Sequence, residues 1–494
     1  MTTLGVHLDE AEHSGIRRRL FGKMKVWRSS WALGLCLLAV VSSCRKADVG
    51  AQSPAPDRPN IILMTIESLR ADHVTCYGYE RETTPHIDAL AGQAIVYDQA
   101  YSVTSWTLPS HASIFTGLYP SAHKVTLPRD RLHDTHLTAA ETLSSSGYQC
   151  AAVVGGPYLR PAFNLHQGFE YFDESVAAAT NEAAHKDVTN PRMAQAMERF
   201  LREGRDRRRP FFLFAYYWDV HYDYIPPPPY DTMFVPAHAE RIGDVQFGPI
   251  ARLGRDISAA ELDYLIAQYD GEIRCTDEHL GHLWELLREL GLWENTAIIL
   301  TADHGEQFFE HSYLGHMLDL YVESLHVPLI IKLPGQSAGR RDRRLVNLID
   351  LHPTILDLAD CRTPLPYNGR SVLSEDDGGP RTTFFELHSS FNIRDKITGK
   401  TVHESDRWVG VRSGNYKLVH VEDTTFWQLY DVVADPAEHN PLDQAHAAKA
   451  QELTEHLERW KAAMMTMGRL WGDGPPAQLS PEEEKRLRAL GYLP

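Results

Sequence analysis

The sequence has little cysteine and no closely spaced cysteine pair. Only 6 of its 494 residues are cysteine, and no two of them stand in a CxxC spacing. This argues against a thiolate zinc site or a dithiol redox centre. Four cysteines follow the N-terminal segment, at Cys76, Cys150, Cys275 and Cys361. In an oxidising compartment they could form up to two disulfides in three alternative pairings, or they could remain buried thiols.

The sequence also lacks an excess of positive charge. Its 49 lysines and arginines face 66 aspartates and glutamates, which gives a formal net charge of -17. A nucleic-acid-binding protein needs a basic face, so we expect no nucleic-acid partner. Hydrophobic residues make up 43% and charged residues 23%, which is typical of a globular chain. The length allows a large core with a smaller second unit.

The N-terminal segment has no apolar run long enough to span a bilayer. Residues 1–30 are polar and basic, and the uncharged run that follows extends only from Trp31 to Val41. As a helix this run measures about 16 Å, whereas the hydrocarbon core of a bilayer is about 30 Å thick. A basic flank, a short apolar core and small residues after it predict an export signal.

The end of this run, Val41-Ser42-Ser43-Cys44, resembles a bacterial lipobox. The resemblance implies a signal peptide over 1–43 and a lipidated Cys44, followed by a Pro-rich linker over 44–57. Several acyl chains would hold the protein firmly on a membrane. We therefore expect a lipid-anchored protein of the bacterial cell envelope, on its periplasmic or extracellular side.

Other interpretations of the N-terminus stay open. A plain cleaved signal or an uncleaved signal anchor would give a different mature protein. Met24 could be the true start, and the stretch Arg18-Arg19-Leu20-Phe21-Gly22-Lys23 resembles a twin-arginine signal.

Beyond the linker, apolar runs alternate with helical patterns. The runs are Asn60–Ile66, Ala151–Val154, Phe211–Tyr217, Ala297–Thr301 and Val327–Lys332, and a long amphipathic helix is predicted over Ala259–Leu290, with Gly291 as its stop. Such runs are typical of strands buried on both faces, and their alternation with helices predicts an α/β fold with a mostly parallel sheet. After about residue 375, short strands and two helices predict a smaller antiparallel sheet. We therefore expect a catalytic domain over 58–375 and an α+β subdomain over 376–494.

Polar clusters follow three of the predicted strands. They are Glu67-Ser68, Asp219-Val220-His221 and Asp303-His304. Ligands bind beyond the carboxyl ends of strands in such sheets, so these side chains are expected near one site. Carboxylate oxygens suit Ca²⁺, Mg²⁺ or Mn²⁺, and an added imidazole allows Zn²⁺. The alternative for any single cluster is a helix cap or a surface acid.

A further candidate is Thr107, in the stretch Ser105–Pro120. Pro109 suits the first turn of a helix, so Thr107 is predicted at or just before a helix N-terminus. Free N–H groups and the helix dipole favour anions there. Metal coordination would lower the pKa of the hydroxyl and make it a nucleophile. The alternative is that Thr107 is only an N-cap.

From residue 58 to the end, the chain contains a series of motifs that resemble those of the sulfatase family and follow in the same order. They are Arg58-Pro59-Asn60-Ile61-Ile62-Leu63 with Leu69-Arg70-Ala71-Asp72-His73, Thr84–Ala91, Pro109-Ser110 with Thr116–Pro120, Asp303-His304-Gly305-Glu306, Glu310-His311, Gly315-His316, Val327–Ile330, and Leu429-Tyr430-Asp431 with Asp435-Pro436. The resemblance implies the alkaline-phosphatase-like fold, a sandwich of a large sheet between helices. It also implies a metal-dependent hydrolase of anionic esters.

The departures from the family pattern lie at functional positions. Sulfatases carry a Cys or Ser, converted to formylglycine, where this chain has Thr107, so no formylglycine is expected. His111 replaces an Arg, Glu67-Ser68 replaces an Asp pair, and His316 replaces a Lys. The stretch Gly155–Leu159 lacks the family's Gly-Lys-Trp-His segment. The cationic cradle for sulfate is therefore missing or replaced by imidazoles, which are only partly charged near neutral pH.

Related members of the superfamily use an unmodified Thr on phosphoesters and phosphodiesters, including phospholipid headgroup transferases. The resemblance assigns the metal to Glu67, Ser68, Thr107, Asp303 and His304. The metal is Ca²⁺ by family resemblance, with Mn²⁺, Mg²⁺ or Zn²⁺ also open. Thr107 would attack sulfur or phosphorus, while His111, His221 and His316 would contact the anionic oxygens or protonate the leaving group. His221 or His316 could instead bind a second metal. Asp219 would contact substrate or only orient His221.

The resemblance leaves several functions open. A hydrolase of phosphoesters, phosphodiesters or phosphonates with Thr107 as nucleophile is favoured. A sulfuric ester hydrolase without formylglycine, a phospho-group transferase and a non-catalytic glycan- or anion-binding lipoprotein are alternatives. The substrate would be an anionic ester in a glycan, a lipid headgroup or a small molecule. Aromatic residues around Trp106 and Trp218 could form a platform for it or could be core.

Overall fold

The computed structural model describes residues 58–179, 188–242, 257–312, 314–374, 381–388, 393–394, 401–402, 406–472, 474–489 and 493. The expected signal, the linker and Cys44 lie outside these residues, as does the expected domain boundary at 375/376. Ser53–Pro494 forms one compact unit. Within the described residues, every helix is too short or too polar to traverse a bilayer.

The main sheet has eight strands in the order β10-β2-β9-β6-β1-β5-β3-β4. They are β1 Asn60–Ile66, β2 Ile95–Tyr101, β3 Gln149–Val154, β4 Tyr171–Asp173, β5 Phe211–Tyr217, β6 Thr296–Ala302, β9 Leu329–Lys332 and β10 Arg340–Asn347. Strand β9 runs antiparallel to both neighbours, and the other pairs are parallel. The predicted mostly parallel sheet is confirmed.

Register within the sheet decides which side chains meet. Ile66, the last residue of β1, pairs with Tyr217 of β5 and with Ala302 of β6. All three strands are buried along their whole length, as their apolar runs predict. The three strands therefore end at one level, and the polar residues that follow them leave the sheet side by side.

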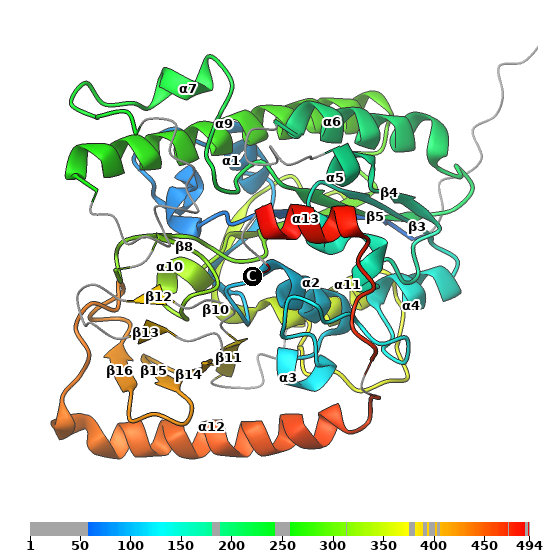
Figure 1. Cartoon of the computed structure of the whole chain (residues 1–494). Helices are drawn as coiled ribbons and strands as arrows, with labels where there is room; N and C mark the ends of the chain where they lie inside the picture. The colour runs from blue at the N-terminus through cyan, green and yellow to red at the C-terminus, as the bar shows by residue number, and fades with distance from the viewer. Residues whose placement is uncertain are drawn as a thin grey trace, which may run out of the picture. The chain divides into compact units, whose positions relative to one another are not determined.

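Helices cover both faces of this sheet (Figure 1). One side carries α1 Pro85–Ala91, α6 Asn190–Arg199 and α9 Ala259–Glu289, and the other carries α2 Thr107–Thr116, α4 Ala139–Ser145 and α11 Leu351–Leu358. The remaining helices here are α3 Pro120–His123, α5 Ser175–Ala179, α7 Tyr230–Met233 and α10 Val322–Leu325, with a π-helix at Phe200–Gly204 and 3-10 turns at Ala71–His73, Thr75–Tyr77, Pro157–Leu159, Pro161–Phe163 and Leu348–Asp350. The resulting helix–sheet–helix layering agrees with the fold that the sequence predicts.

The long helix α9 shows how local sequence sets its ends. Ser258 caps its first turn through a hydrogen bond from the Glu261 backbone N–H, and the Glu261 carboxylate accepts from the Ser258 N–H in return. The helix ends at Glu289, and Gly291 follows with a left-handed backbone (φ 66°). The predicted helix and its glycine stop are confirmed.

A smaller antiparallel sheet of β11 Thr382–His388, β14 Arg407–Ser413, β15 Tyr416–Val421 and β16 Trp427–Asp431 follows, as predicted. Two-stranded ribbons pair β7 Gln307–Phe308 with β8 Leu314–Gly315, and β12 Ile393–Arg394 with β13 Thr401–Val402. Helix α12 Ala447–Gly468, after a 3-10 turn at Gln444–His446, packs on β14 and β15. Its residues Leu453, Leu457 and Trp460 share a core with Tyr119 from the first part of the chain.

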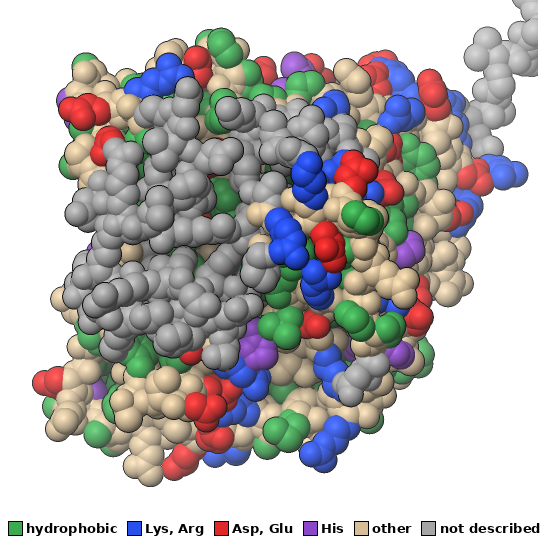
Figure 2. Space-filling model, viewed as in Figure 1, with side chains coloured by type: hydrophobic (Ala, Val, Ile, Leu, Met, Phe, Trp, Pro, Cys, Tyr) green, Lys and Arg blue, Asp and Glu red, His purple; other side chains and the backbone are tan. Residues whose placement is uncertain are grey.

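The last helix, α13 Pro481–Ala489, returns to the first part of the chain. Glu484 pairs with Arg129 at 2.8 Å, and Glu483 pairs with Arg160 at 3.1 Å. Figure 2 shows basic and acidic side chains close together over the area where Figure 1 places α13. These exposed ion pairs supply orientation more than stability.

The four cysteines of the folded unit are free thiols. Cys150, Cys275 and Cys361 are buried, and burial raises the pKa of the Cys150 thiol to about 12. Of the two alternatives that the sequence leaves open, the structure shows buried thiols rather than disulfides.

Candidate active site

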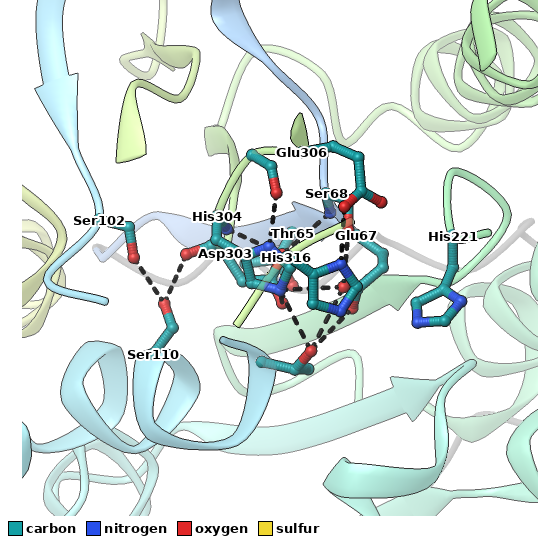
Figure 3. A network of polar contacts seen from close by, with 12 residues as sticks. Thr65, Glu67, Ser68, Ser102, Ser110, His221, Asp303, His304, Glu306 and His316 are labelled. Atoms are coloured by element: carbon teal, nitrogen blue, oxygen red, sulfur yellow. Dashed lines mark hydrogen bonds and ion pairs between the residues drawn. The ribbon is translucent and has the colours of Figure 1, made fainter. Parts of the chain in front are cut away.

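The ends of β1 and β6 bring Glu67, Asp303 and His304 together beside the N-terminus of α2 (Figure 3). All three side chains are fully buried. His304 Nε2 lies 3.1 Å from Glu67 Oε1 and 3.6 Å from Asp303 Oδ2. Two of the three predicted polar clusters thus form one site, because equal strand register places their first residues at the same level.

Thr107 is the first residue of α2, and its hydroxyl belongs to the same site. Its Oγ1 lies 3.3 Å from Glu67 Oε1 and 3.3 Å from His304 Nε2. The residue before it, Trp106, is the N-cap and makes no side-chain cap hydrogen bond. Thr107 therefore does not serve as the cap, and its hydroxyl points at the carboxylate and the imidazole instead.

The buried charges of the cluster act strongly on one another. Although burial opposes ionisation, His304 holds the pKa of Glu67 well below its usual range. Burial together with the Glu67 charge holds the pKa of Asp303 well above its usual range. Burial lowers the pKa of His304, but the charges of Asp303 and Glu67 outweigh it and raise that pKa to about 10. Two carboxylates this close favour a cation between them.

The donor set fits a divalent metal. Asp303 Oδ1 accepts from the backbone N–H groups of Ser68 and His304, whereas the buried Oδ2 has no hydrogen-bond donor among the described residues. His304 Nδ1 is 2.8 Å from the Gly305 carbonyl, an arrangement that leaves Nε2 to face the cluster. A histidine fixed through its second nitrogen in this way is typical of metal ligands. Glu67, Asp303, His304 and Thr107 could therefore hold one ion.

His316 adds a further imidazole to the cluster, with its ring centre 4.5 Å from that of His304. One donor atom each from Glu67, His304 and His316 lie within 4.8 Å of one another. His316 Nδ1 is 3.0 Å from Glu306 Oε1, and the Tyr224 hydroxyl donates to Glu306 Oε2 at 2.9 Å. Glu306 thus orients His316, so His316 could serve as a metal ligand or as a contact to substrate.

The sequence placed Glu306 in a polar cluster without a role of its own, and it gave Tyr216 only as part of a possible aromatic platform. Glu306 is fully buried, and burial raises its pKa to about 8. The hydroxyl of Tyr216, on β5, donates to Glu67 Oε2. Glu306 could have been found as the acid that ends Asp303-His304-Gly305-Glu306. Nothing local distinguished Tyr216 from the other aromatic residues of β5.

His111 is fully buried beside the cluster, and its contacts are to protein groups. Its Nε2 is 2.9 Å from Thr65 Oγ1, its Nδ1 is 2.8 Å from the Thr107 carbonyl, and its ring packs on Tyr216. Burial lowers the pKa of His111 to about 4, so the ring is neutral at physiological pH. The expected contact with anionic substrate oxygens is not what this geometry favours, since both nitrogens already have protein partners. The geometry favours a role in positioning Thr107.

Ser68 also differs from its expected role. Its hydroxyl donates to Glu67 Oε1 at 3.0 Å. A left-handed backbone (φ 54°) turns the chain after β1 and directs the Ser68 N–H to Asp303 at 3.2 Å. The residue therefore orients two carboxylates of the cluster, which favours a supporting role over direct metal ligation.

The third predicted cluster divides between two places. His221 is buried, stacks on Trp218 at 4.0 Å between ring centres, and lies 5.3 Å from the ring of His316. Figure 3 shows it to one side of the other labelled histidines. The carboxylate of Asp219 accepts from the backbone N–H groups of Thr189 and Asn190, where α6 begins. These hydrogen bonds make Asp219 a capping residue for the first turn of α6, and its expected contact with substrate or His221 stays a prediction.

Comparisons with known proteins agree with this fold. The family model described as Sulfatase matches residues 59–361, and one described as N-sulphoglucosamine sulphohydrolase, C-terminal, matches residues 310–463. The multifunctional alkaline phosphatase superfamily protein PehA of Trinickia caryophylli is 25% identical, over 82% of this chain and 95% of that protein. The N-acetylglucosamine-6-O-sulfatase of Bacteroides thetaiotaomicron is 23% identical, over 88% of this chain and 91% of that protein.

A solved structure shows the same fold. The phosphonate monoester hydrolase of Agrobacterium radiobacter superposes with a TM-score of 0.65 at 22% identity, over 82% of this chain and 96% of that one. The Sulfatase model alone covers more than half of the chain, in the region that contains every residue of the buried cluster. The chain therefore belongs to the sulfatase family of the alkaline phosphatase superfamily, and it is an ester hydrolase.

Proposed function

We propose that this chain is a metal-dependent hydrolase of phosphate- or phosphonate-type esters in which unmodified Thr107 is the nucleophile. The position of the Thr107 hydroxyl carries the proposal, because it lies 3.3 Å from both Glu67 Oε1 and His304 Nε2. Threonine has no route to the aldehyde that sulfatases use. Its hydroxyl is nonetheless where an activated nucleophile is needed, at the N-terminus of a ten-residue helix.

Sulfatase-family proteins typically bind a divalent metal. A metal held by Glu67, Asp303 and His304 would lower the pKa of the Thr107 hydroxyl and stabilise charge on the oxygens of the ester. The imidazole and carboxylate donors favour Zn²⁺ or Mn²⁺ over Ca²⁺, which prefers an all-oxygen shell. Asp303 Oδ2 supports this assignment, since its burial without a donor is costly unless a cation is present.

The chain's own groups supply the remaining chemistry of the proposal. Thr107 Oγ1, after losing its proton to solvent, attacks phosphorus, the bond to the leaving oxygen breaks, and His221 in its protonated form gives that oxygen a proton. His316 is less suited to this step, because burial and the charge of His304 hold its pKa well below the usual range. Water then releases the phosphoryl group from Thr107 with His221 as base. Glu306 keeps His316 in one orientation, and His111 holds the first turn of α2 through the Thr107 carbonyl.

The choice of phosphorus over sulfur rests on the nucleophile, because a threonine hydroxyl cannot be converted to the formylglycine that sulfatases use. The similarity to PehA, a multifunctional protein of the alkaline phosphatase superfamily, and to a phosphonate monoester hydrolase is consistent with this preference. A sulfuric ester hydrolase without formylglycine is the second candidate, favoured by the similarity to an N-acetylglucosamine-6-O-sulfatase.

The test is a substrate panel on protein lacking residues 1–43, loaded in turn with Zn²⁺, Mn²⁺, Mg²⁺ and Ca²⁺. Aryl sulfate, phosphate monoester, phosphodiester and phosphonate monoester would be run on wild type, Thr107→Ala and Thr107→Ser. We expect phosphodiester or phosphonate hydrolysis that falls about 10³-fold or more in Thr107→Ala and is largely kept in Thr107→Ser.

Two outcomes would change the conclusion. A preference for aryl sulfate, lost in Thr107→Ala, would establish the second candidate. Equal trace activity in wild type and Thr107→Ala, with metal bound in both, would exclude Thr107 as nucleophile on these esters. It would instead support a non-catalytic protein that binds a glycan or another anion. Alcohol acceptors added to the same assay would reveal a phospho-group transferase.

A further inference from the structure

A second group of metal-ligating side chains lies outside the cluster around Thr107. It consists of His311, Glu323 and His439, and one donor atom from each lies within 4.8 Å of the other two. His311 follows the short strand β7, Glu323 belongs to α10, and His439 follows β16 of the small sheet. Two segments close in sequence and a third, more than 100 residues further along the chain, therefore converge on one point.

The geometry of this group is fixed by contacts around it. His311 Nε2 is 3.3 Å from Glu323 Oε2 and 3.2 Å from the Ala437 carbonyl oxygen. The His311 ring stacks on Tyr321 at 3.8 Å between ring centres, with an interplanar angle of 11°. The ring of His439 lies 5.3 Å from that of His311. His439 is exposed, and one of its donor atoms already lies within 4.8 Å of those of His311 and Glu323.

The surroundings carry an excess of buried negative charge. Asp319 is fully buried, and its Oδ2 has no hydrogen-bond donor among the described residues. Glu323 contacts His311 directly at 3.3 Å, and the charge of Asp319 also acts on His311. The neighbouring Glu438 is neutralised by Lys417 at 2.7 Å, so it adds no net charge. Asp319 and Glu323 thus favour a cation here beyond what His311 supplies.

We propose that His311, Glu323 and His439 form a second metal site, for Zn²⁺ or a similar transition metal. Two imidazoles and one carboxylate are a donor set that suits Zn²⁺, with water or the Ala437 carbonyl completing the shell. The ion would tie the segment after β16 to the loop that leads to His316. Its role is structural and independent of the reaction at Thr107.

The experiment measures metal stoichiometry in the mature chain without residues 1–43. Protein stripped with a chelator is dialysed against Zn²⁺, and bound metal is counted by mass spectrometry in wild type, His439→Ala and His238→Ala. His238 is a matched control, because it is an exposed histidine paired with a single carboxylate, Asp263, at 2.7 Å. We expect His439→Ala to bind one Zn²⁺ fewer per chain than wild type and His238→Ala.

Equal stoichiometry in all three proteins would overturn the proposal. Glu323→Gln provides a second variant, since the amide is close to isosteric but a poor ligand, and it should also lose one ion. Thr107→Ala leaves the second site intact. The double variant Thr107→Ala/His439→Ala should therefore bind one Zn²⁺ fewer per chain than Thr107→Ala alone. The loss of one ion would therefore support the second metal site even if the protein hydrolysed none of the esters in the substrate panel.

Discussion

Thr107, Glu67 and Asp303 show how much single residues depend on neighbours from other segments. Each is fully buried, and each makes a polar contact with a residue at least 40 positions away in the sequence. A buried charge without a partner is strongly unfavourable. The site is therefore a network in which one substitution changes the charge or the hydrogen bonds of several groups. Substitutions of the supporting residues can test it as well as substitutions of the proposed nucleophile, Thr107.

Glu306 is the first such residue. We expect Glu306→Gln to lower kcat by about 10- to 100-fold with a smaller change in KM, because the amide can no longer fix His316 through Nδ1 as a carboxylate does. The pH profile of kcat should also change, since His316 loses its acidic partner. Steady-state kinetics across pH, with thermal unfolding to verify the fold, would measure this.

Tyr224→Phe is the matched control for Glu306→Gln. It removes the second hydrogen bond to Glu306 and leaves the contact to His316 intact. We expect a smaller loss than in Glu306→Gln. Equal losses in both variants would show that the network acts only through packing.

His111 gives a prediction that separates positioning from substrate contact. We expect His111→Phe to destabilise the fold by about 2–4 kcal/mol, because Thr65 Oγ1 and the Thr107 carbonyl lose their buried partner. The milder His111→Asn should keep KM near that of wild type while kcat falls. An increase in KM alone, with kcat unchanged, would favour the substrate contact that the sequence suggested.

At the scale of elements, the sequence predicted the strands well and the side-chain directions less well. The apolar runs that became β1, β5 and β6 were visible locally, and parallel pairing then placed Glu67 next to Asp303 and His304. The direction of His111 depends on Thr65 of another strand, and Asp219 caps the first turn of α6. These side-chain directions are set by contacts with residues distant in sequence, so no local sequence pattern could predict them.

The turn after β6 depends on the absence of a side chain at Gly305. A Cβ atom there would lie 1.9 Å from the Glu323 carbonyl oxygen, which is rigid backbone. We expect Gly305→Ala to force β6 and α10 apart, with an unfolding free energy lower by several kcal/mol, about 3 or more, and loss of metal binding by His304. Urea unfolding and metal analysis would measure both effects.

Gly291→Ala is a suitable control for Gly305→Ala. Gly291 also has a positive φ, of 66°, but a Cβ atom there meets nothing within 4 Å. It should lose only the roughly 1 kcal/mol expected for a left-handed residue that is not glycine. Similar losses in the two variants would contradict the steric argument.

Glu386, on β11, gives a pH-dependent prediction for the contact between the small sheet and α3. Burial raises its pKa to about 7, while its carboxylate accepts from the Ser121 N–H at 2.7 Å. The folded chain then holds a proton between pH 4.5 and 7 that the unfolded chain has lost, so this group's contribution to stability falls as pH rises through that window. Glu386→Gln keeps an acceptor but does not titrate.

We therefore expect Glu386→Gln to match wild type near pH 4.5 and to become more stable than wild type by up to about 3 kcal/mol above pH 7. Urea unfolding of both proteins at several pH values would measure the difference. Because all other groups titrate in both proteins, the difference isolates Glu386. Curves that stay parallel from acid to alkaline pH would contradict the assigned pKa.

At the scale of the whole molecule, we propose that the chain is anchored on the bacterial cell envelope through Cys44, on the periplasmic or extracellular side. The support is the lipobox-like stretch Val41-Ser42-Ser43-Cys44 after a short apolar run. Expressed in a bacterial host fed a labelled fatty acid, the wild-type chain should carry the label and sediment with membranes. Cys44→Ala should lose both properties. Label retained in Cys44→Ala would contradict the proposal.

The hydrophobic core shared by the two sheets determines whether the chain can be shortened to a single folded domain. Tyr119 packs edge-on against Trp460 of α12 at 5.2 Å, and Val103, Leu118 and Ile349 join the same cluster as β14 and β15. Tyr119 and Leu118 follow α2 directly, the helix that begins with Thr107. A chain shortened to the strands and helices before residue 375 would present this apolar surface to water, at the end of α2 opposite to Thr107. The C-terminal segment therefore completes the core of the first part of the chain. We expect that neither the part before residue 375 nor the part after it would be recovered in soluble form without the other.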